Sequence, residues 1–250
     1  MPIRRFSFWL LLSSCFWALS VAQANPETLS RSVYKGSFSG WKVEMVRTLT
    51  HTGNDQYVLR SEAKNLFASV VETSEFSLQR PQLIPTSYVY TRSVFGRQAN
   101  EKIQFDWQAN TAFYSRSDRP QNNMQHTLVT GLLDPALYQI ALQADLANGK
   151  ENLQYTFIKR KRQETYEFQL LPNEQFSLQK KNYDALVLLR KDTDNNKTTR
   201  IWVLPELDYQ VAKIHHTDDG DTYEITLAAY QGDSVRLKQF YNSLLPELTE

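Results

Sequence analysis

The sequence predicts a mostly β protein, a curved antiparallel sheet with one central helix packed on its concave face. Along many short stretches, apolar and polar residues alternate with a period of two, which is typical of half-buried strands. The connections between these stretches are short, and short connections favour antiparallel neighbours over crossover units. One segment near the middle of the chain has instead the spacing and end signals of an amphipathic helix.

The composition of the chain excludes several classes of protein. Its 250 residues include 28 Lys and Arg against 27 Asp and Glu, a net charge of +1, which exerts no long-range attraction on nucleic-acid phosphates. Apolar residues make up 41% and aromatic residues 12%, too much for a disordered chain, and 8 Gly argue against a Gly-rich phosphate loop. We therefore expect a folded protein that binds no nucleic acid.

Residues 1–24 are predicted to be a signal peptide. Two arginines precede an uncharged apolar stretch at residues 6–21, and the small-residue pattern Ala22-Gln23-Ala24 then favours cleavage after Ala24. A membrane anchor is the alternative, but about 16 apolar residues are fewer than the roughly 20 that a membrane-spanning helix requires. We expect an exported, periplasmic protein that is not an integral membrane protein after cleavage.

Lipidation of Cys15 is a second alternative for this segment, because Leu12-Ser13-Ser14-Cys15 has the shape of a lipoprotein-processing site. The residues that follow Cys15 are still apolar and extend the hydrophobic region, whereas a soluble tether would be polar. Cleavage after Ala24 would remove this single cysteine, and the remaining chain is large enough to fold without disulfides. We expect no lipidation and no Cys metal ligand.

Strands are predicted in the first half of the remaining chain. Between Val33 and Leu49, apolar residues recur at alternate positions and indicate one half-buried strand. A Gly53-Asn54-Asp55 turn follows it. Further strand-like stretches, separated by short polar or proline-containing connections, are residues 56–63, 69–79, 86–94, 101–107 and 112–116.

A helix is predicted to begin at Asp134, which can cap free backbone N–H groups, with Pro135 in the first helical position. Asn148-Gly149 provides its end. Its apolar residues fall on one face, at Leu137, Ile140, Ala141 and Ala144. Since such a face must be covered, we expect the helix to lie as a plug or lid on the concave face of the sheet.

The alternating pattern resumes after Gly149, with turns predicted at Pro172-Asn173, residues 192–197 and residues 218–221. A short C-terminal helix is predicted over residues 234–245. No linker or composition shift divides the chain, so residues 25–250 are expected to form a single β-rich domain. The strand-like stretches of this half are residues 153–157, 166–170, 186–188, 201–203 and 223–229.

The order of these features resembles the bacterial exported family known as domain of unknown function 3108, over about residues 30–230. The residues that carry the resemblance, beside the export signal and the Asp134 helix, are Tyr34, Trp41, Leu83-Ile84-Pro85, Phe105-Asp106-Trp107, Tyr166, Phe168 and the segment from Arg200 to Tyr209. The resemblance implies an envelope protein whose curved antiparallel sheet forms a half-barrel, similar in outline to periplasmic lipoprotein carriers. It implies no catalytic residues.

Two motifs suggest chemistry but have a simpler structural explanation. Gly36-Ser37-Phe38-Ser39-Gly40 has Phe38 where a Gly-x-Ser-x-Gly hydrolase motif has its nucleophile, so we interpret its glycines as relieving crowding at a strand bend. His215 and His216 precede three aspartates, but adjacent residues of a strand point to opposite faces and do not share one metal ion easily. We expect a solvated hairpin there, and neither a metal nor a cofactor.

Lys159, Arg160, Lys161 and Arg162 form a run of four cations at the junction of two strands. Such a run can contact an anionic surface of lipid headgroups or lipopolysaccharide, with roughly 1 kcal/mol per charge near a membrane. It can equally be a soluble hairpin tip or a protected sheet edge. The sequence leaves both interpretations open.

Bulky apolar residues are the candidates for ligand binding. If several of them face the concave side, they line an apolar cavity. Otherwise they form an ordinary core under the helix, and periodicity does not distinguish the two cases. These candidates are Trp41, Phe105, Trp107, Leu137, Ile140, Trp202 and Tyr209.

Together these features predict a non-enzymatic periplasmic binding or carrier module for a lipid or another amphiphile. The alternative is an envelope assembly or interaction protein that uses an exposed strand edge or the basic run. A cell-envelope hydrolase is a third, weaker hypothesis, because no catalytic constellation is evident.

Overall fold

The structure is a computed structural model that describes residues 25–38, 41–191 and 197–246. Within these ranges, fourteen strands form one sheet in the order β8-β7-β6-β5-β4-β3-β2-β1-β14-β13-β12-β11-β10-β9. Each strand pairs with its neighbours in antiparallel orientation. In chain order, the strands are β1 (Glu27–Phe38), β2 (Trp41–Gly53), β3 (Gln56–Lys64), β4 (Ala68–Gln79), β5 (Gln82–Val94), β6 (Arg97–Asp106), β7 (Thr111–Arg116), β8 (Met124–Thr127), β9 (Leu153–Lys159), β10 (Arg162–Leu178), β11 (Lys181–Lys191), β12 (Lys197–Leu204), β13 (Gln210–Asp218) and β14 (Asp221–Gly232).

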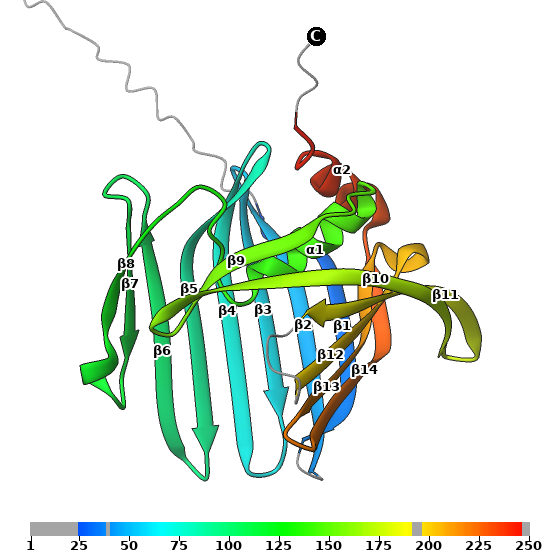
Figure 1. Ribbon diagram of the computed structural model, residues 1–250, viewed down its shortest axis with the longest axis horizontal. Helices are drawn as coiled ribbons and strands as arrows, with labels where there is room; N and C mark the ends of the chain where they lie inside the picture. Colours follow the sequence, from blue (N-terminus) through cyan, green and yellow to red (C-terminus); the bar gives the residue numbers. More distant parts are fainter. Residues whose placement is uncertain (1–24, 39–40, 192–196, 247–250) are drawn as a thin grey trace, which may run out of the picture.

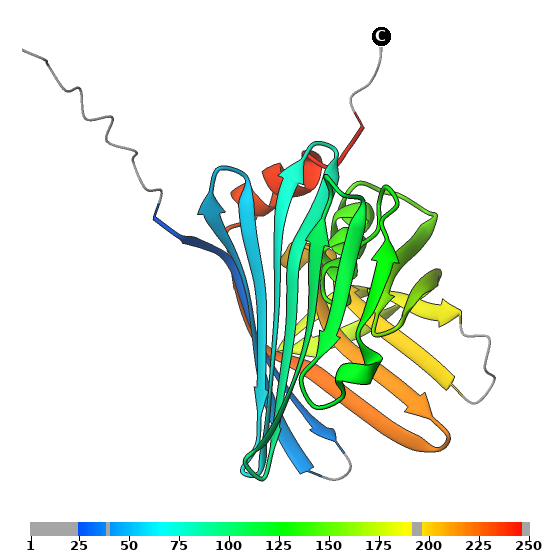
Figure 2. The same cartoon turned by 90° about the vertical axis from the view of Figure 1, so that its left-hand side faces the viewer.

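The sheet is strongly curved but not closed into a barrel. Strands β2 to β6 form one wall, and β9 and β10 cross in front of it (Figure 1). The view turned by 90° shows the same wall from its side and the curl of the remaining strands away from it (Figure 2). The two edge strands, β8 and β9, do not pair with each other as strands. The expected curved, mostly β, antiparallel architecture is therefore present.

Tight hairpins connect most of the strands, and their turn residues explain several of the boundaries. Asn54 and Asp55 have positive φ values of 50° and 54° in the β2–β3 turn, a conformation that Asn and Asp tolerate better than other residues. The turn predicted at Gly53-Asn54-Asp55 is therefore confirmed. The long β10–β11 hairpin turns at Gln179 and Lys180 in the same left-handed region.

The single strand predicted between Val33 and Leu49 is wrong, because two strands, β1 and β2, occupy this range and pair with each other. Phe38 at the end of β1 pairs with Trp41 at the start of β2. Tyr34 pairs with Met45, which means that the inward positions change from even to odd numbers at this reversal. The alternation therefore changes phase between β1 and β2, and the interpretation as one strand overlooks this change.

The turn predicted at Pro172-Asn173 is also wrong. Strand β10 continues through both residues, which lie at an irregularity in its pairing with β11, between Leu171 and Glu174. A bulge accommodates a proline in a strand, because it leaves the missing N–H outside the ladder. The short strand β8 has too few residues for a periodic pattern and was not predicted.

Two α-helices accompany the sheet in the part of the chain that the structure describes: α1 (Leu137–Ala147) and α2 (Ser234–Asn242). Helix α1 begins three residues after Asp134, whose Oδ1 accepts hydrogen bonds from the N–H groups of Ala136 and Leu137 at 2.8 and 2.9 Å. Helix α2 lies within residues 234–245, where the sequence predicts a terminal helix. Neither helix is long and apolar enough to cross a membrane.

Helix α1 is attached both to the wall of β2 to β6 and to the opposite wall, formed by β10 to β14. Arg47 on β2 donates a hydrogen bond to Gln139, and Gln143 donates to the backbone oxygen of Tyr209 at 3.0 Å. Helix α1 also packs against β9 and α2. The fully buried Leu137 and Leu142 belong to the larger of two hydrophobic clusters, to which both walls contribute.

Parts of the strands β11 to β13 are buried on both faces. In β12, Ile201 and Val203 belong to the larger cluster, whereas Trp202 and Leu204 belong to a second, smaller one. This second cluster also contains residues of the long β10–β11 hairpin, such as Phe176. A strand that is buried on both faces has a continuous apolar sequence, as Ile201-Trp202-Val203-Leu204 has.

Candidate functional site

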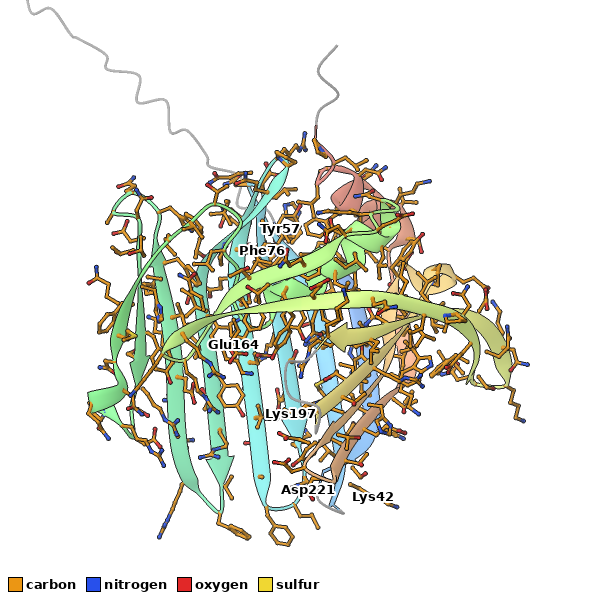
Figure 3. All side chains as sticks on the ribbon, viewed as in Figure 1. Lys42, Tyr57, Phe76, Glu164, Lys197 and Asp221 are labelled. Atoms are coloured by element: carbon orange, nitrogen blue, oxygen red, sulfur yellow. The ribbon has the colours of Figure 1, made fainter. Side chains whose placement is uncertain are left out.

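A pocket of about 360 Å³ lies beside the start of α1, on the side of the larger cluster, and is called the inner pocket here. Figure 3 labels Lys197, one of its lining residues. Six elements contribute to it. Its lining consists of Pro135 and Tyr138, of Phe157 and Lys159 on β9, of Tyr166 on β10, of Arg190 on β11, of Lys197 and Thr199 on β12, and of Ile214, His216 and Asp218 on β13.

One wall of the inner pocket is aromatic. The ring of Phe157 stacks on Tyr138 at a centroid distance of 5.1 Å and meets the ring of Tyr166 edge-to-face at 4.7 Å. Tyr138 also contacts Tyr166 edge-to-face at 5.5 Å. Aromatic rings prefer these two geometries, so the three side chains hold one another in place. Burial raises the pKa of Tyr138 to about 12, so its hydroxyl stays protonated at neutral pH.

The rim of the inner pocket is cationic. The guanidinium of Arg190 lies 4.4 Å from the ring centroid of Tyr166. Lys159 Nζ donates hydrogen bonds to Tyr166 Oη at 3.1 Å and to Glu164 at 3.0 Å, and Lys197 forms a 3.4 Å salt bridge with Asp218. The pocket therefore combines an apolar wall with charged groups at its opening, a combination that suits an amphiphilic ligand.

The basic run forms the turn between β9 and β10, where Arg160 has a φ of 57°. It lines a second pocket of about 430 Å³, here called the seam pocket. The other side of this pocket comes from β7 and the residues after it. The lining residues are Tyr114, Arg116, Arg119, Asn122, Lys159, Arg160, Lys161, Arg162 and Glu164.

The predicted ligand-binding residues do not converge on one pocket. Phe105, Leu137 and Ile140 are buried in the larger cluster, and Trp107 packs against it while its Nε1 donates to the backbone oxygen of Pro85 at 2.8 Å. These side chains belong to the core under α1. None of them lines the inner pocket or the seam pocket.

The remaining three candidates lie elsewhere. Trp202 belongs to the second cluster, and its Nε1 donates to Glu174 at 2.9 Å. Tyr209 is half-buried against the larger cluster. Trp41 begins β2, but its side chain lies outside the described part of the structure. A ligand-binding role for these residues stays a prediction.

Sequence reasoning missed most of the inner pocket. Tyr138 and Tyr166 are 28 positions apart, and only the packing of α1 against β9 and β10 brings them together. The signal that could have identified one wall is the pair Tyr166 and Phe168, which alternates with polar residues along β10. Lys159 is the one predicted site residue that lines the inner pocket.

The two adjacent histidines have separate partners. His216 Nδ1 lies 2.8 Å from Thr199 Oγ1 on β12, whereas His215 Nδ1 lies 3.2 Å from Glu224 on β14. Each partner is the residue directly opposite in the pairing. Among the described residues, no group of three or more His, Cys, Asp or Glu side chains is arranged to hold a metal ion.

Comparison with known proteins gives a family and a fold. The sequence profile of a family described as "Protein of unknown function (DUF3108)" matches residues 32–228. No curated protein matches the chain. Among solved structures, the beta-barrel-like protein of domain of unknown function DUF1849 from Brucella abortus is similar, with a TM-score of 0.53 and 8% identity over 82% of this chain and 98% of that chain. At this identity, the likeness shows the fold alone.

Proposed function

From the premise that the chain belongs to the DUF3108 family of proteins of unknown function, we propose that it is a non-enzymatic binding or carrier protein for a lipid or another amphiphile. The inner pocket holds the apolar part of this ligand. The proposal rests on one observation, the juxtaposition of the aromatic wall of Tyr138, Phe157 and Tyr166 with the cations Lys159 and Arg190. Small-molecule pockets of this volume usually combine an apolar lining with a few polar groups that orient the ligand.

Helix α1 acts in this proposal as a fixed plug on the concave face. Its hydrogen bonds from Arg47 and to Tyr209 hold it against both walls, and its apolar face is buried. Tyr138, in the first turn of the helix, extends this plug into the wall of the inner pocket. The helix thereby separates the filled core from the part of the concave side that stays open for a ligand.

We also propose that the protein works in the periplasm after cleavage behind Ala24. The apolar stretch and the small-residue pattern of the first 24 residues support this location. N-terminal sequencing of protein recovered from the periplasmic fraction tests it. A sequence that begins at Asn25 is expected, and recovery of the intact N-terminus in the cytosolic fraction would contradict the proposal.

Binding of a fluorescent fatty acid to the purified protein tests the ligand class. Tyr166→Ala removes one ring of the aromatic wall and is expected to weaken binding about fivefold, since each lost aromatic contact is worth of the order of 1 kcal/mol. Tyr183→Ala is the matched control. Tyr183, like Tyr166, packs against a hydrophobic cluster and has a cation over its ring, here Lys181 at 4.4 Å, but it is buried in the second cluster.

Native mass spectrometry of protein purified from the periplasm provides a second readout, with a co-purifying apolar ligand as the expected result. Protein that is ligand-free and binds no fatty acid would refute the proposed function. Equal weakening by both tyrosine substitutions would place the binding site outside the inner pocket. Turnover in an activity screen that depends on one His, Asp or Glu would instead favour an enzyme.

A further inference from the structure

The two edges of the open sheet approach each other at the β9–β10 turn. His126 Nε2 on β8 lies 3.2 Å from the backbone oxygen of Arg160. Gln163 Nε2 on β10 donates to the backbone oxygen of Thr127 on β8 at 3.0 Å. Side chains thus join the edges where the strand ladder is absent, and the seam pocket lies at this junction.

The seam pocket collects six cations from two distant parts of the sequence. Arg116 is the last residue of β7 and Arg119 lies shortly after it, whereas the run Lys159 to Arg162 forms the β9–β10 turn. Three carboxylates form salt bridges with these cations, those of Glu101, Asp118 and Glu164. The cations therefore outnumber the carboxylates two to one, in a protein whose total charge is nearly balanced.

The carboxylates fix part of the cationic lining in position. The side chain of Arg116 is 12% exposed and is held between Glu101 and Asp118, at 3.4 and 2.6 Å. Glu164, which is 14% exposed, accepts from Lys159 at 3.0 Å and from Arg162. An oriented guanidinium or ammonium group loses less conformational entropy when it binds an anion.

The remaining cations of the pocket make a weak salt bridge or none within the described ranges. Within the described ranges, Arg119 and Lys161 make no salt bridge, and both side chains are exposed at the pocket. Arg160 is 67% exposed and lies 3.9 Å from Glu101, which is a weak pair. The positive charge that the carboxylates leave uncompensated is therefore concentrated on the side of the pocket that faces solvent.

We propose that the seam pocket binds a phosphate group. A phosphate carries up to two negative charges and presents oxygens that match the forked N–H groups of arginine. Lys159 lines both pockets, so a phosphate in the seam pocket would be next to an apolar chain in the inner pocket. This second step rests on the proposed function and identifies the amphiphile as one with a phosphate headgroup; the phosphate site itself does not depend on it.

Isothermal titration of the purified protein with inorganic phosphate, in a chloride buffer of constant ionic strength, tests the site. The double variant Arg119→Ser and Lys161→Ser removes two unpaired cations without breaking a described salt bridge. We expect it to weaken phosphate binding about tenfold, from the loss of two charge-assisted contacts. The control Arg97→Ser and Lys238→Ser removes the same charge from exposed positions outside the pocket, and is expected to change the affinity less than twofold.

A short-chain phosphatidic acid below its micelle concentration distinguishes the two sources of phosphate. If it binds more tightly than inorganic phosphate and the seam variant weakens both, the site takes a lipid headgroup. If the two bind equally, the site takes free phosphate, and the assignment of a phosphate headgroup to the amphiphile fails while the phosphate site stands; the fatty-acid assay decides the proposed function separately. The absence of saturable phosphate binding, or equal weakening in the seam variant and its control, would overturn the phosphate site.

Discussion

Asp134 is a buried carboxyl group whose ionisation should make the stability of the fold depend on pH. Its side chain is fully buried, accepts from two N–H groups at the start of α1 and is hydrogen-bonded to the buried Ser74 on β4. Burial raises the pKa of Asp134 to about 7, an effect to which the charge of Glu72 adds and which the hydrogen bonds oppose. The protonated form is therefore the favoured form in the folded protein below neutral pH.

The sign and size of the effect follow from proton linkage. Between about pH 4 and 7, the folded protein holds a proton at Asp134 that the unfolded chain has released, so the free energy of unfolding falls as the pH rises. The stabilisation that comes from the proton on Asp134 is complete below about pH 4 and is lost as the pH rises through about 7. A shift from 3.8 to about 7 corresponds to about 4 kcal/mol, at about 1.4 kcal/mol per pKa unit.

Asp134→Asn removes the titration and keeps most of the geometry. The amide oxygen can still accept from Ala136 and Leu137, and the amide nitrogen can donate to Ser74 Oγ. Urea unfolding, followed by tryptophan fluorescence from pH 4.5 to 8, measures both proteins. We expect the variant to be the more stable protein at pH 8 by about 2–4 kcal/mol, and this advantage to disappear towards pH 4.5.

The difference between the two proteins isolates Asp134, because the other titrating groups are common to both. Asp134→Ala is the control for the cap, and it should lose about 1 kcal/mol relative to Asp134→Asn at each pH. Parallel stability curves for the wild-type protein and Asp134→Asn would refute the reasoning. The carboxyl group would then be charged in the folded protein at acid pH, and burial would not control its ionisation.

Three further perturbations follow from the packing. Leu137→Ala, at a fully buried position of α1, should lower the free energy of unfolding in urea by about 2–5 kcal/mol, and a loss below 1 kcal/mol would show that the helix is not an integral part of the core. Gly36→Ala places a Cβ in steric conflict with the backbone oxygen of Glu224 and should cost about 1–3 kcal/mol in thermal unfolding. The control Ser37→Ala, at the exposed neighbouring position, should cost under about 0.5 kcal/mol, and equal effects would contradict the close approach of β1 and β14. Gln163→Ala should speed amide hydrogen exchange in β8 and change the free energy of unfolding by less than about 1 kcal/mol. The control Gln104→Ala removes a similar hydrogen bond, to the backbone oxygen of Thr86 at 2.9 Å. Unchanged exchange in β8 in the Gln163 variant, or equally faster exchange in the control, would argue against the seam contact.

The strands could largely be predicted because their signal is local. Alternation over five or more residues requires no knowledge of the partner strand, and it identified most of the hairpin arms. It failed at two points. Between Phe38 and Trp41 the chain reverses and the alternation changes phase, which a single predicted strand overlooks, and at Pro172 a turn-like dipeptide lies inside a strand.

The two pockets could not be predicted, because their residues lie close together in space but far apart in the sequence. Arg116 and Arg119 meet the basic run because β8 and the β9–β10 turn lie at the two edges of one curled sheet. The candidate Trp202 shows a related limit. Both faces of the second half of β12 are buried, so its apolar run does not indicate which of the two hydrophobic clusters a given side chain belongs to.

The pairing of β1 with β14 determines the order in which the sheet can be completed. Tyr34 faces Leu227, so the first strand to be synthesised lies in the middle of the sheet, beside the last one. The other pairings join strands that are consecutive along the chain and can form while synthesis continues. Until β14 arrives, β1 presents an open row of N–H and C=O groups that other chains can pair with. Truncation of the last strand would therefore turn the centre of this sheet into an aggregation-prone edge.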